Sequence, residues 1–236
     1  MLKLKEKLQY LKNVVEVLEK LTIETDIVFK EEGIFIRAIH LSKHCYVIFE
    51  INKSMFEEYN IKKEITYTLN LQLLNKIIKK VGKKELFIKA QDDRLYISGD
   101  KNDFQLNYFV GSKDERPRPD IQTSSKWKIK STDFFSNVSE LLDFSEICKI
   151  GGSELTLHIK SKMVQGDVNL EAEKIESDGC WCWYDLTYID MIKDIKNIFD
   201  EIRIGFSQTQ PIIIRAKNDD IDFEFMLACR VEENDE

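Results

Sequence analysis

Four lysines recur along a stretch with the periodicity of an amphipathic helix, residues 71–81. Lys76, Lys79, Lys80 and Lys83 stand at positions i, i+3, i+4 and i+7, so they share one side of the helix or of its end. The apolar stripe consists of Leu74, Ile77, Ile78 and Val81. Lysine is a mobile point charge that suits contact with phosphate without base recognition. The pattern predicts a helix that packs on a sheet and offers ammonium groups to a polyanion, although a solvated helix face without a ligand has the same pattern.

The other predicted helices carry less positive charge. The helix at 7–21 mixes lysines with glutamates, the helix from residue 131 has no lysine or arginine before residue 147, and the helix at 188–201 interleaves lysines with aspartates. A surface that faces phosphate is therefore expected mainly in the first half of the chain.

The five cysteines do not form a disulfide framework, because their number is odd and their spacing irregular. The segment 180–184, Cys-Trp-Cys-Trp-Tyr, alternates as a strand does. No second Cys/His pair stands at zinc-finger spacing. We expect reduced thiols and no metal, and keep as an alternative a metal-dependent enzyme that uses Cys180, Cys182 and one histidine.

No catalytic motif is present in the sequence. Phosphate-binding glycine loops, the H-E-x-x-H zinc motif and the G-x-S-x-G nucleophile elbow are all missing. Gly151-Gly152 has the position of a hairpin turn. The sequence predicts no cofactor and no enzymatic activity.

Composition indicates a globular chain with an uneven charge. Of its 236 residues 43% are hydrophobic, the formal net charge is −7, and no apolar run approaches the length of a membrane span. A charged N-terminus also argues against a secretory signal. The acidic total argues against a nucleic-acid partner, but residues 1–113 sum to +4 and residues 126–236 to −10. The position of the charge therefore leaves a nucleic-acid partner open.

The elements that position these residues repeat once along the chain. Helices are predicted at 7–21, 71–81, 134–142 and 188–201, the third of them capped by Ser131-Thr132-Asp133. Strands are predicted at 26–30, 34–39, 45–51, 86–90, 95–98, 104–110, 126–130, 147–150, 154–159, 167–172, 180–186, 201–206, 211–216 and 222–228. Pro117 and Pro119 lie in the segment between the halves and indicate an extended linker. We predict an α+β fold with two similar domains, 1–113 and 126–236, joined by a linker at 114–125.

Several local strings, in this order, resemble the PCNA-type DNA sliding clamp of archaea and eukaryotes. They are Glu32-Gly33-Ile34, the segment 38–44 (Ala-Ile-His-Leu-Ser-Lys-His), 55–59 (Met-Phe-Glu-Glu-Tyr), 69–71 (Leu-Asn-Leu), 75–79 (Asn-Lys-Ile-Ile-Lys) and 227–232 (Leu-Ala-Cys-Arg-Val-Glu). The likeness runs over almost the whole chain, with element order preserved.

This resemblance implies a non-enzymatic processivity factor. Clamps of this type form a ring of three two-domain subunits whose helices line the hole and contact duplex DNA through phosphates. The DNA-facing residues it implies, together with the lysine row, are Lys12, Lys76, Lys79, Lys80, Lys83 and Lys193.

The resemblance also implies two protein-binding surfaces. The subunit interface would pair edge strands at about 103–110 and 167–172, with Phe104, Leu106, Tyr108, Val168 and Leu170. A pocket for short partner peptides would comprise Ile39, Pro119, Ile121, Pro211, Met226, Leu227 and Ala228. The implied partners are DNA polymerase, flap endonuclease, DNA ligase and the clamp loader.

The sequence departs from the family on its third helix. Ser136 and Ser139 stand where the family usually has basic residues, and Cys229 replaces the usual proline near the C-terminus. A subunit of a heterotrimeric ring would tolerate such asymmetry, so homotrimer and heterotrimer both stay open. A checkpoint-type clamp subunit acting in the DNA damage response is the other reading. The location implied is the archaeal cytoplasm at the nucleoid, or the nucleus in a eukaryote.

Overall fold

The protein is described here by a computed structural model that covers residues 1–82, 84–91, 93–111, 118–161 and 163–230. The chain forms two compact units: one lies within Met1–Pro117 and includes Lys217–Phe223, and the other lies within Arg118–Ala216 and Glu224–Glu236. No helix in the described part of the chain is long and apolar enough to cross a membrane.

The first unit contains two helices, α1 and α2, and strands β1 to β10. In chain order its elements are β1 (Leu2–Leu4), α1 (Leu8–Leu21), β2 (Glu24–Phe29), β3 (Gly33–Ile39), β4 (Cys45–Asn52), η1 (Lys53–Met55), β5 (Glu58–Tyr59), β6 (Ile65–Asn70), α2 (Leu71–Val81), β7 (Leu86–Gln91), β8 (Arg94–Gly99), β9 (Asp103–Asn107) and β10 (Phe109–Val110). One sheet has the order β5-β1-β7-β8-β9, and a second contains β10-β6-β2-β3-β4. All strand pairs in both are antiparallel.

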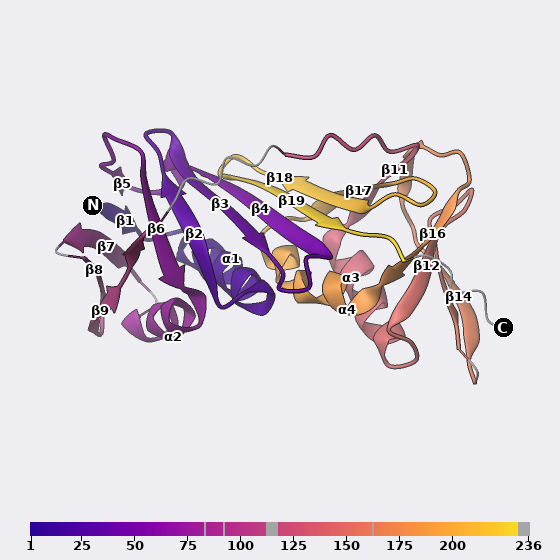
Figure 1. Ribbon diagram of the computed structural model, residues 1–236, viewed down its shortest axis with the longest axis horizontal. Helices are drawn as coiled ribbons and strands as arrows, with labels where there is room; N and C mark the ends of the chain where they lie inside the picture. Colours follow the sequence, from indigo (N-terminus) through magenta and orange to yellow (C-terminus); the bar gives the residue numbers. More distant parts are fainter. Residues whose placement is uncertain (83, 92, 112–117, 162, 231–236) are drawn as a thin grey trace. The chain divides into compact units, whose positions relative to one another are not determined.

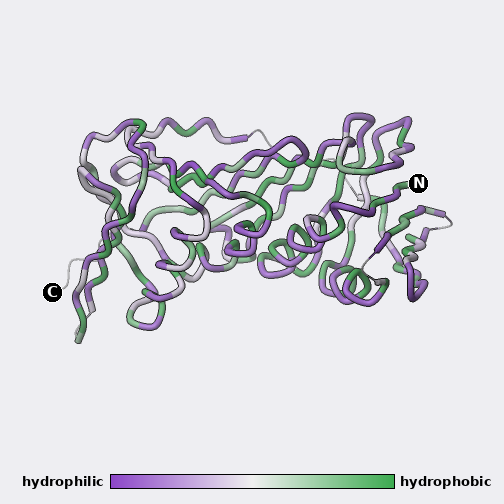
Figure 2. The backbone as a smooth tube through the Cα atoms, turned by 180° about the vertical axis from the view of Figure 1, so that it is seen from behind, coloured by the Kyte–Doolittle hydropathy of each residue, from purple (hydrophilic) through white to green (hydrophobic). Residues whose placement is uncertain are grey.

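Both helices of this unit are amphipathic and pack together against a sheet (Figure 1). The apolar side of α1 is buried along its length, with Val14, Val17 and Leu18 fully covered. Along the tube in Figure 2, hydrophobic and hydrophilic residues alternate around the helical turns. The helix layer therefore leaves its polar side outward, which is the arrangement predicted from the lysine row.

The turn that leads into β3 depends on a glycine. Gly33 has φ of 152°, and a Cβ there would lie 2.0 Å from the carbonyl oxygen of Ile51. Only glycine avoids that clash, so the turn at 30–33, where the N–H of Lys30 donates to the carbonyl of Gly33 at 2.8 Å, requires glycine at this position.

The second unit repeats the plan with α3, α4 and a further set of strands. Its elements are β11 (Ser125–Lys130), α3 (Ser131–Leu142), β12 (Ile147–Gly151), β13 (Thr156–Lys160), β14 (Gln165–Asn169), β15 (Glu173–Glu176), β16 (Trp181–Asp185), α4 (Leu186–Met191), η2 (Lys193–Asn197), β17 (Glu201–Phe206), β18 (Ile212–Lys217) and β19 (Ile221–Leu227). The last two strands are joined by the hairpin Lys217–Phe223, which is assigned to the first unit. One sheet has the order β14-β13-β12-β16, and another contains β19-β18-β17-β11-β15. Figure 1 shows α3 and α4 beneath β17, β18 and β19.

The prediction of one continuous α-helix at 188–201 is wrong. It is a short α-helix, α4, followed by the 3₁₀ segment η2. Ile189, Ile192, Ile195 and Ile198 are all buried and recur every three residues. A three-residue repeat stays on one side only if the helix tightens to three residues per turn, which explains the 3₁₀ segment.

The predicted cap of α3 is also wrong. No side chain accepts a capping hydrogen bond from a backbone N–H at the start of this helix, where Lys130 is the N-cap residue. The hydroxyl of Ser131 is buried and donates instead to the carbonyls of Phe199 and Asp200. It ties the helix to the segment that leads into β17.

The single strand predicted at 104–110 is two strands in different sheets. β9 is the outer strand of the five-stranded sheet, whereas β10 pairs with β6. The chain changes sheet at Tyr108, whose ring lies 4.0 Å from the ring of Tyr67 on β6. This aromatic contact holds the crossover in place.

The prediction lacks β1, β5, β6 and β15. β1 and β5 are three and two residues long, which is too short for a periodic pattern. All four side chains of β15 are exposed, so it has no buried face to give an alternation. β6 has only one buried residue, Leu69, and its pattern is equally weak.

Candidate functional site

The lysine row lies on the exposed side of α2. Lys76, Lys79 and Lys80 are exposed there, while Lys83 lies outside the described residues. The helix begins at an Asn70 cap, whose side chain accepts a hydrogen bond from the N–H of Leu73 at 3.0 Å. The predicted spacing is therefore present on a helix with a defined start.

Two of the predicted cations have partners within the first unit. Nζ of Lys79 lies 2.7 Å from Oε1 of Glu16 on α1. Nζ of Lys12 donates to the carbonyl of Gly82, at 3.1 Å, where α2 ends. Lys12 therefore compensates the negative end of the α2 dipole. Sequence reasoning did not find these partners, because each pair joins residues of two different helices.

Lys76 and Lys80 differ from Lys79 and Lys12, which have partners. Within the described part of the chain neither makes an ion pair, and both side chains are exposed. They are the residues of α2 best placed to meet a polyanion.

On the helices of the second unit, Lys193, Asp190 and Ser139 form a hydrogen-bonded network with no net charge. Nζ of Lys193 lies 2.8 Å from Oδ2 of Asp190, and the hydroxyl of Ser139 donates to the other oxygen of that carboxylate at 2.8 Å. Ser136 is exposed on α3 and adds no charge. The charge of the predicted cation Lys193, at the start of η2, is thus largely balanced by Asp190 of α4.

The residues predicted for the partner-peptide pocket differ in exposure. Pro119 is exposed, and Ile121, Pro211, Met226 and Ala228 are half-buried. Leu227 has 1% of its surface exposed, so its side chain belongs to the core of the second unit. Ile39 is half-buried at the end of β3 in the first unit.

The strands predicted for the subunit interface both lie at sheet edges. β9 ends the five-stranded sheet and β14 ends the four-stranded sheet. Phe104, Tyr108 and Val168 are half-buried, whereas Leu106 and Leu170 are buried within their own units. An edge strand offers unpaired backbone groups, so β9 and β14 could each accept a further strand.

β10 forms an apolar patch at the edge of the other sheet of the first unit. Phe109 and Val110 are 70% and 79% exposed, although both are large hydrophobic residues. They form the outermost strand beside β6. Exposed apolar residues on an edge strand are typical of a surface that a partner covers.

The thiols give the enzyme alternative no support. Burial raises the pKa of Cys148 to about 12, and burial also raises the pKa of Cys180 and Cys229. A raised pKa disfavours the thiolate that a nucleophile or zinc ligand requires. Among the residues that the structure describes, no three His, Cys, Asp or Glu side chains are grouped to hold a metal.

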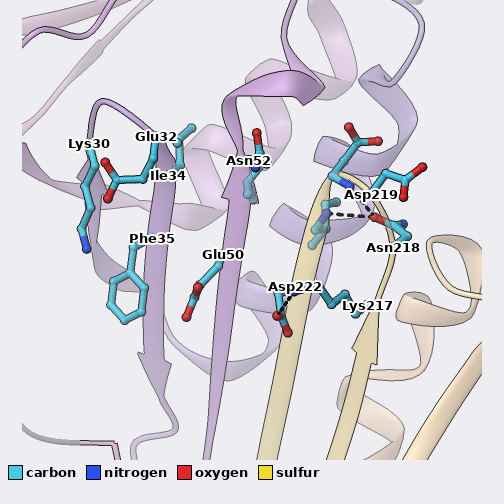
Figure 3. Close-up of a pocket in the computed structure, with 14 residues that line it drawn as sticks. Lys30, Glu32, Ile34, Phe35, Glu50, Asn52, Lys217, Asn218, Asp219 and Asp222 are labelled. Carbon is cyan, nitrogen blue, oxygen red and sulfur yellow. Dashed lines mark hydrogen bonds and ion pairs between the residues drawn. The ribbon is translucent and has the colours of Figure 1, made fainter.

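A hollow of about 340 Å³ opens in the first unit, beside the turn between β2 and β3 and the hairpin 217–222 (Figure 3). Most of the residues that line it are charged or polar. Two of them form an ion pair, in which Nζ of Lys217 donates to Oδ2 of Asp222 at 2.9 Å. None of the predicted site residues lines it. Its acids belong to no metal-binding group among the described residues.

The sequence family of the first unit is identified by comparison. The family model of the proliferating cell nuclear antigen (PCNA) N-terminal domain matches residues 1–108. The DNA polymerase sliding clamp 1 of Sulfurisphaera ohwakuensis is 25% identical over 217 residues, which cover 86% of this chain and 87% of that protein. The chain is similar to PCNA-type sliding clamps over most of its length. The DNA polymerase sliding clamp of Nitrosopumilus maritimus, 24% identical over 235 residues, covers 94% of this chain and 95% of its own length.

Solved structures of this clamp family share the fold over nearly the whole chain. A chain of the PCNA2–PCNA3 complex from Sulfolobus tokodaii superposes with a TM-score of 0.86 at 22% identity, covering 98% of this chain and 99% of its own. PCNA from Entamoeba histolytica gives the same TM-score at 23% identity and covers 98% of both chains. The predicted α+β clamp fold is confirmed.

Proposed function

We propose that this protein is a DNA sliding clamp, which encircles duplex DNA as part of a three-subunit ring and tethers DNA polymerase to its template. It acts without catalysing a reaction. The observation that carries the proposal is the clamp fold over 98% of the chain, with an exposed lysine row on α2. DNA and polymerase are the partners that this family implies.

The charge distribution supports contact with DNA through phosphates alone. Lys76 and Lys80 are point charges on a helix, and lysines of this kind neutralise phosphate without reading bases. The acidic total of −7 does not oppose this contact, because a ring that holds DNA topologically needs positive charge only on its lining. Binding would then be independent of sequence and sensitive to salt.

The absence of surplus positive charge on the helices of the second unit favours a heteromeric ring. Lys193 is paired with Asp190, and α3 has no lysine or arginine. We therefore place this chain as one subunit beside sister clamps that supply the missing charge. The PCNA2–PCNA3 complex is a structural relative that is itself heteromeric.

Further enzymes would bind the clamp through short peptides. Flap endonuclease, DNA ligase and the clamp loader are proposed to use the surface that contains Pro119, Pro211 and Met226, in addition to DNA polymerase. A replication role is favoured over a checkpoint role, because the curated relatives described above are named DNA polymerase sliding clamps. The protein would work where chromosomal DNA is, at the nucleoid of an archaeal cell or in a nucleus.

The decisive experiment compares circular and linear DNA. The protein is loaded with its sister subunits and loader onto nicked circular DNA, and the retained clamp is measured before and after the circle is cut. We expect retention on the circle and rapid loss from the linear form. Equal retention on both forms would contradict encirclement.

Substitution of Lys76 and Lys80 tests the DNA-facing surface. The K76A/K80A variant should bind DNA more weakly, with a salt slope smaller by about 2, since each lost phosphate contact removes about 0.9 from that slope. Lys62 and Lys63 are exposed on a loop, so K62A/K63A is the matched control and should keep the wild-type slope. An unchanged slope for K76A/K80A would remove α2 from the DNA interface.

A further inference from the structure

The segment that joins the two units is attached to the second unit at both ends of its described part. At one end Nε of Arg118 donates to Oε1 of Glu224 at 2.9 Å. At the other end the N–H of Ser124 donates to Oγ of Ser207 at 2.7 Å, and that hydroxyl donates to the carbonyl of Gln122 at 3.4 Å. The residues between these attachments are Pro119, Asp120 and Ile121.

Glu224 is a buried carboxylate on the polar side of its strand. In β19 it alternates with the core residues Phe223 and Phe225. Its side chain is nevertheless only 2% exposed. A carboxylate is buried to this extent only when it is paired. Its partners are Arg118 and Arg215, whose Nε donates to Oε2 at 2.7 Å.

The ion pairs keep this carboxylate charged. Burial by itself raises the pKa of Glu224, and the hydrogen bonds from Arg118 and Arg215 outweigh it and hold the pKa below the usual value. Each carboxylate oxygen therefore has an arginine of its own. The arrangement connects the linker, β18 and β19 through one side chain.

The anchor lies beside the proposed peptide surface. Met226 follows two residues later on the same side of β19, which is about 7 Å along the strand, and it is half-buried. Pro119 follows Arg118 directly and is exposed. One ion pair therefore fixes both the strand and the linker segment that would contact a peptide.

We propose that the Arg118–Glu224 ion pair is a positioning device that holds residues 119–121 in place for partner peptides. This inference rests on the function proposed above. A linker that is already ordered loses less conformational freedom when a peptide binds, so the pair increases affinity without touching the peptide. Glu224 and Arg118 are positioning residues, and Arg215 keeps the carboxylate in place.

The test replaces Arg118, because its side chain is 44% exposed and its loss leaves the core intact. R118A is compared with wild type in binding a fluorescent peptide that carries a glutamine and a hydrophobic-aromatic plug, and in hydrogen exchange of residues 119–124. We expect the dissociation constant to rise about tenfold, in line with a loss of preorganisation, and exchange to increase. R118K, which keeps the charge but not the planar fork, should recover part of the affinity.

A matched control removes an ion pair from the neighbouring hairpin. Lys217 and Asp222 pair at 2.9 Å with both side chains exposed, and K217A does not touch the linker. It should leave both the peptide affinity and the exchange unchanged. Faster exchange in R118A with unchanged peptide affinity would overturn the proposal, and so would unchanged exchange.

A failure of the positioning role can be told from a failure of the clamp function. If the wild-type protein is retained on circular DNA but does not bind the peptide, the inference about the linker is wrong and the sliding clamp stands. If the wild-type protein is not retained on circular DNA, the proposed clamp function is wrong. In R118A, retention on circular DNA should equal that of the wild type.

Discussion

Individual lysines on the helices of the first unit differ in the charge that they can offer to DNA. Lys79 is held by Glu16 and Lys12 by the carbonyl of Gly82. Lys76 and Lys80 have no such ion pair in the described part of the chain. The lysines of α2, which look uniform in the sequence, therefore differ: Lys79 is neutralised by an acid of another helix, whereas the charges of Lys76 and Lys80 are not neutralised by an ion pair among the described residues.

The buried carboxylate of Glu224 makes part of the stability depend on pH. Its folded-state pKa is lowered, so its contribution is complete above the unfolded value of 4.5 and is lost as the pH falls through the folded pKa. We expect E224Q to lower the free energy of unfolding by about 1–3 kcal/mol near neutral pH. The difference should shrink as the pH is lowered below 4.5, measured by urea unfolding at several pH values.

A second substitution controls for loss of charge as such. Asp222 lies on the same strand, but its carboxylate is 41% exposed, so D222N should change the unfolding free energy little at any of these pH values. A deficit in E224Q that stays constant down to the lowest pH would show that the ion pairs are not its cause.

The thiols should react according to burial. At mildly alkaline pH, iodoacetamide should modify Cys180 and Cys229 slowly in the native protein, because both are half-buried and their pKa values are raised. The buried Cys45, Cys148 and Cys182 should react only after unfolding. Peptide mass spectrometry of native and urea-treated samples measures the order, and rapid modification of Cys148 in the native protein would contradict its burial.

At the level of elements, α2 begins with a side-chain cap and α3 does not. N70A removes the hydrogen bond to the N–H of Leu73 and should destabilise the first unit by about 1 kcal/mol. K130A at the start of α3 removes no such bond and should be close to neutral. The midpoint of thermal unfolding checks both, and equal shifts would mean that the Asn70 cap contributes nothing specific.

Elements with a strong hydrophobic period could be predicted from the sequence, and elements set by tertiary contacts could not. α2 has the predicted bounds, because its apolar stripe and its cap are local signals. The crossover at Tyr108 could not be predicted, since it depends on a ring in β6. The fully exposed β15 likewise has no pattern in its own sequence and is defined by its pairing with β11.

The candidate site follows the same division. The lysine row could be predicted from the sequence, because the helical spacing of its residues is a local pattern. The role of Glu224 could not be predicted, because its partner Arg118 lies 106 positions away in the sequence. The sequence alone shows only an acidic residue on the outward side of a strand. Burial of a charge is a property of the folded chain, so only the structure could identify this anchor.

For the whole molecule, ring composition is the property to test. If the ring is heteromeric as proposed, the chain alone should stay below the mass of a trimer in size-exclusion chromatography with light scattering, because ring closure then requires the edge strands of sister subunits. Mixing with sister clamp subunits should give one species of three subunits. A stable homotrimer at the same concentration would contradict the heteromeric ring and leave the clamp fold unaffected.

The exposed strand β10 has a consequence for how a cell must produce this protein. Phe109 and Val110 remain open to solvent in the single chain. A copy made in excess of its partner subunits would expose this apolar edge strand to chaperones and proteases. Its abundance is then expected to follow the synthesis of its companions, so that surplus copies are degraded and assembly itself sets the stoichiometry.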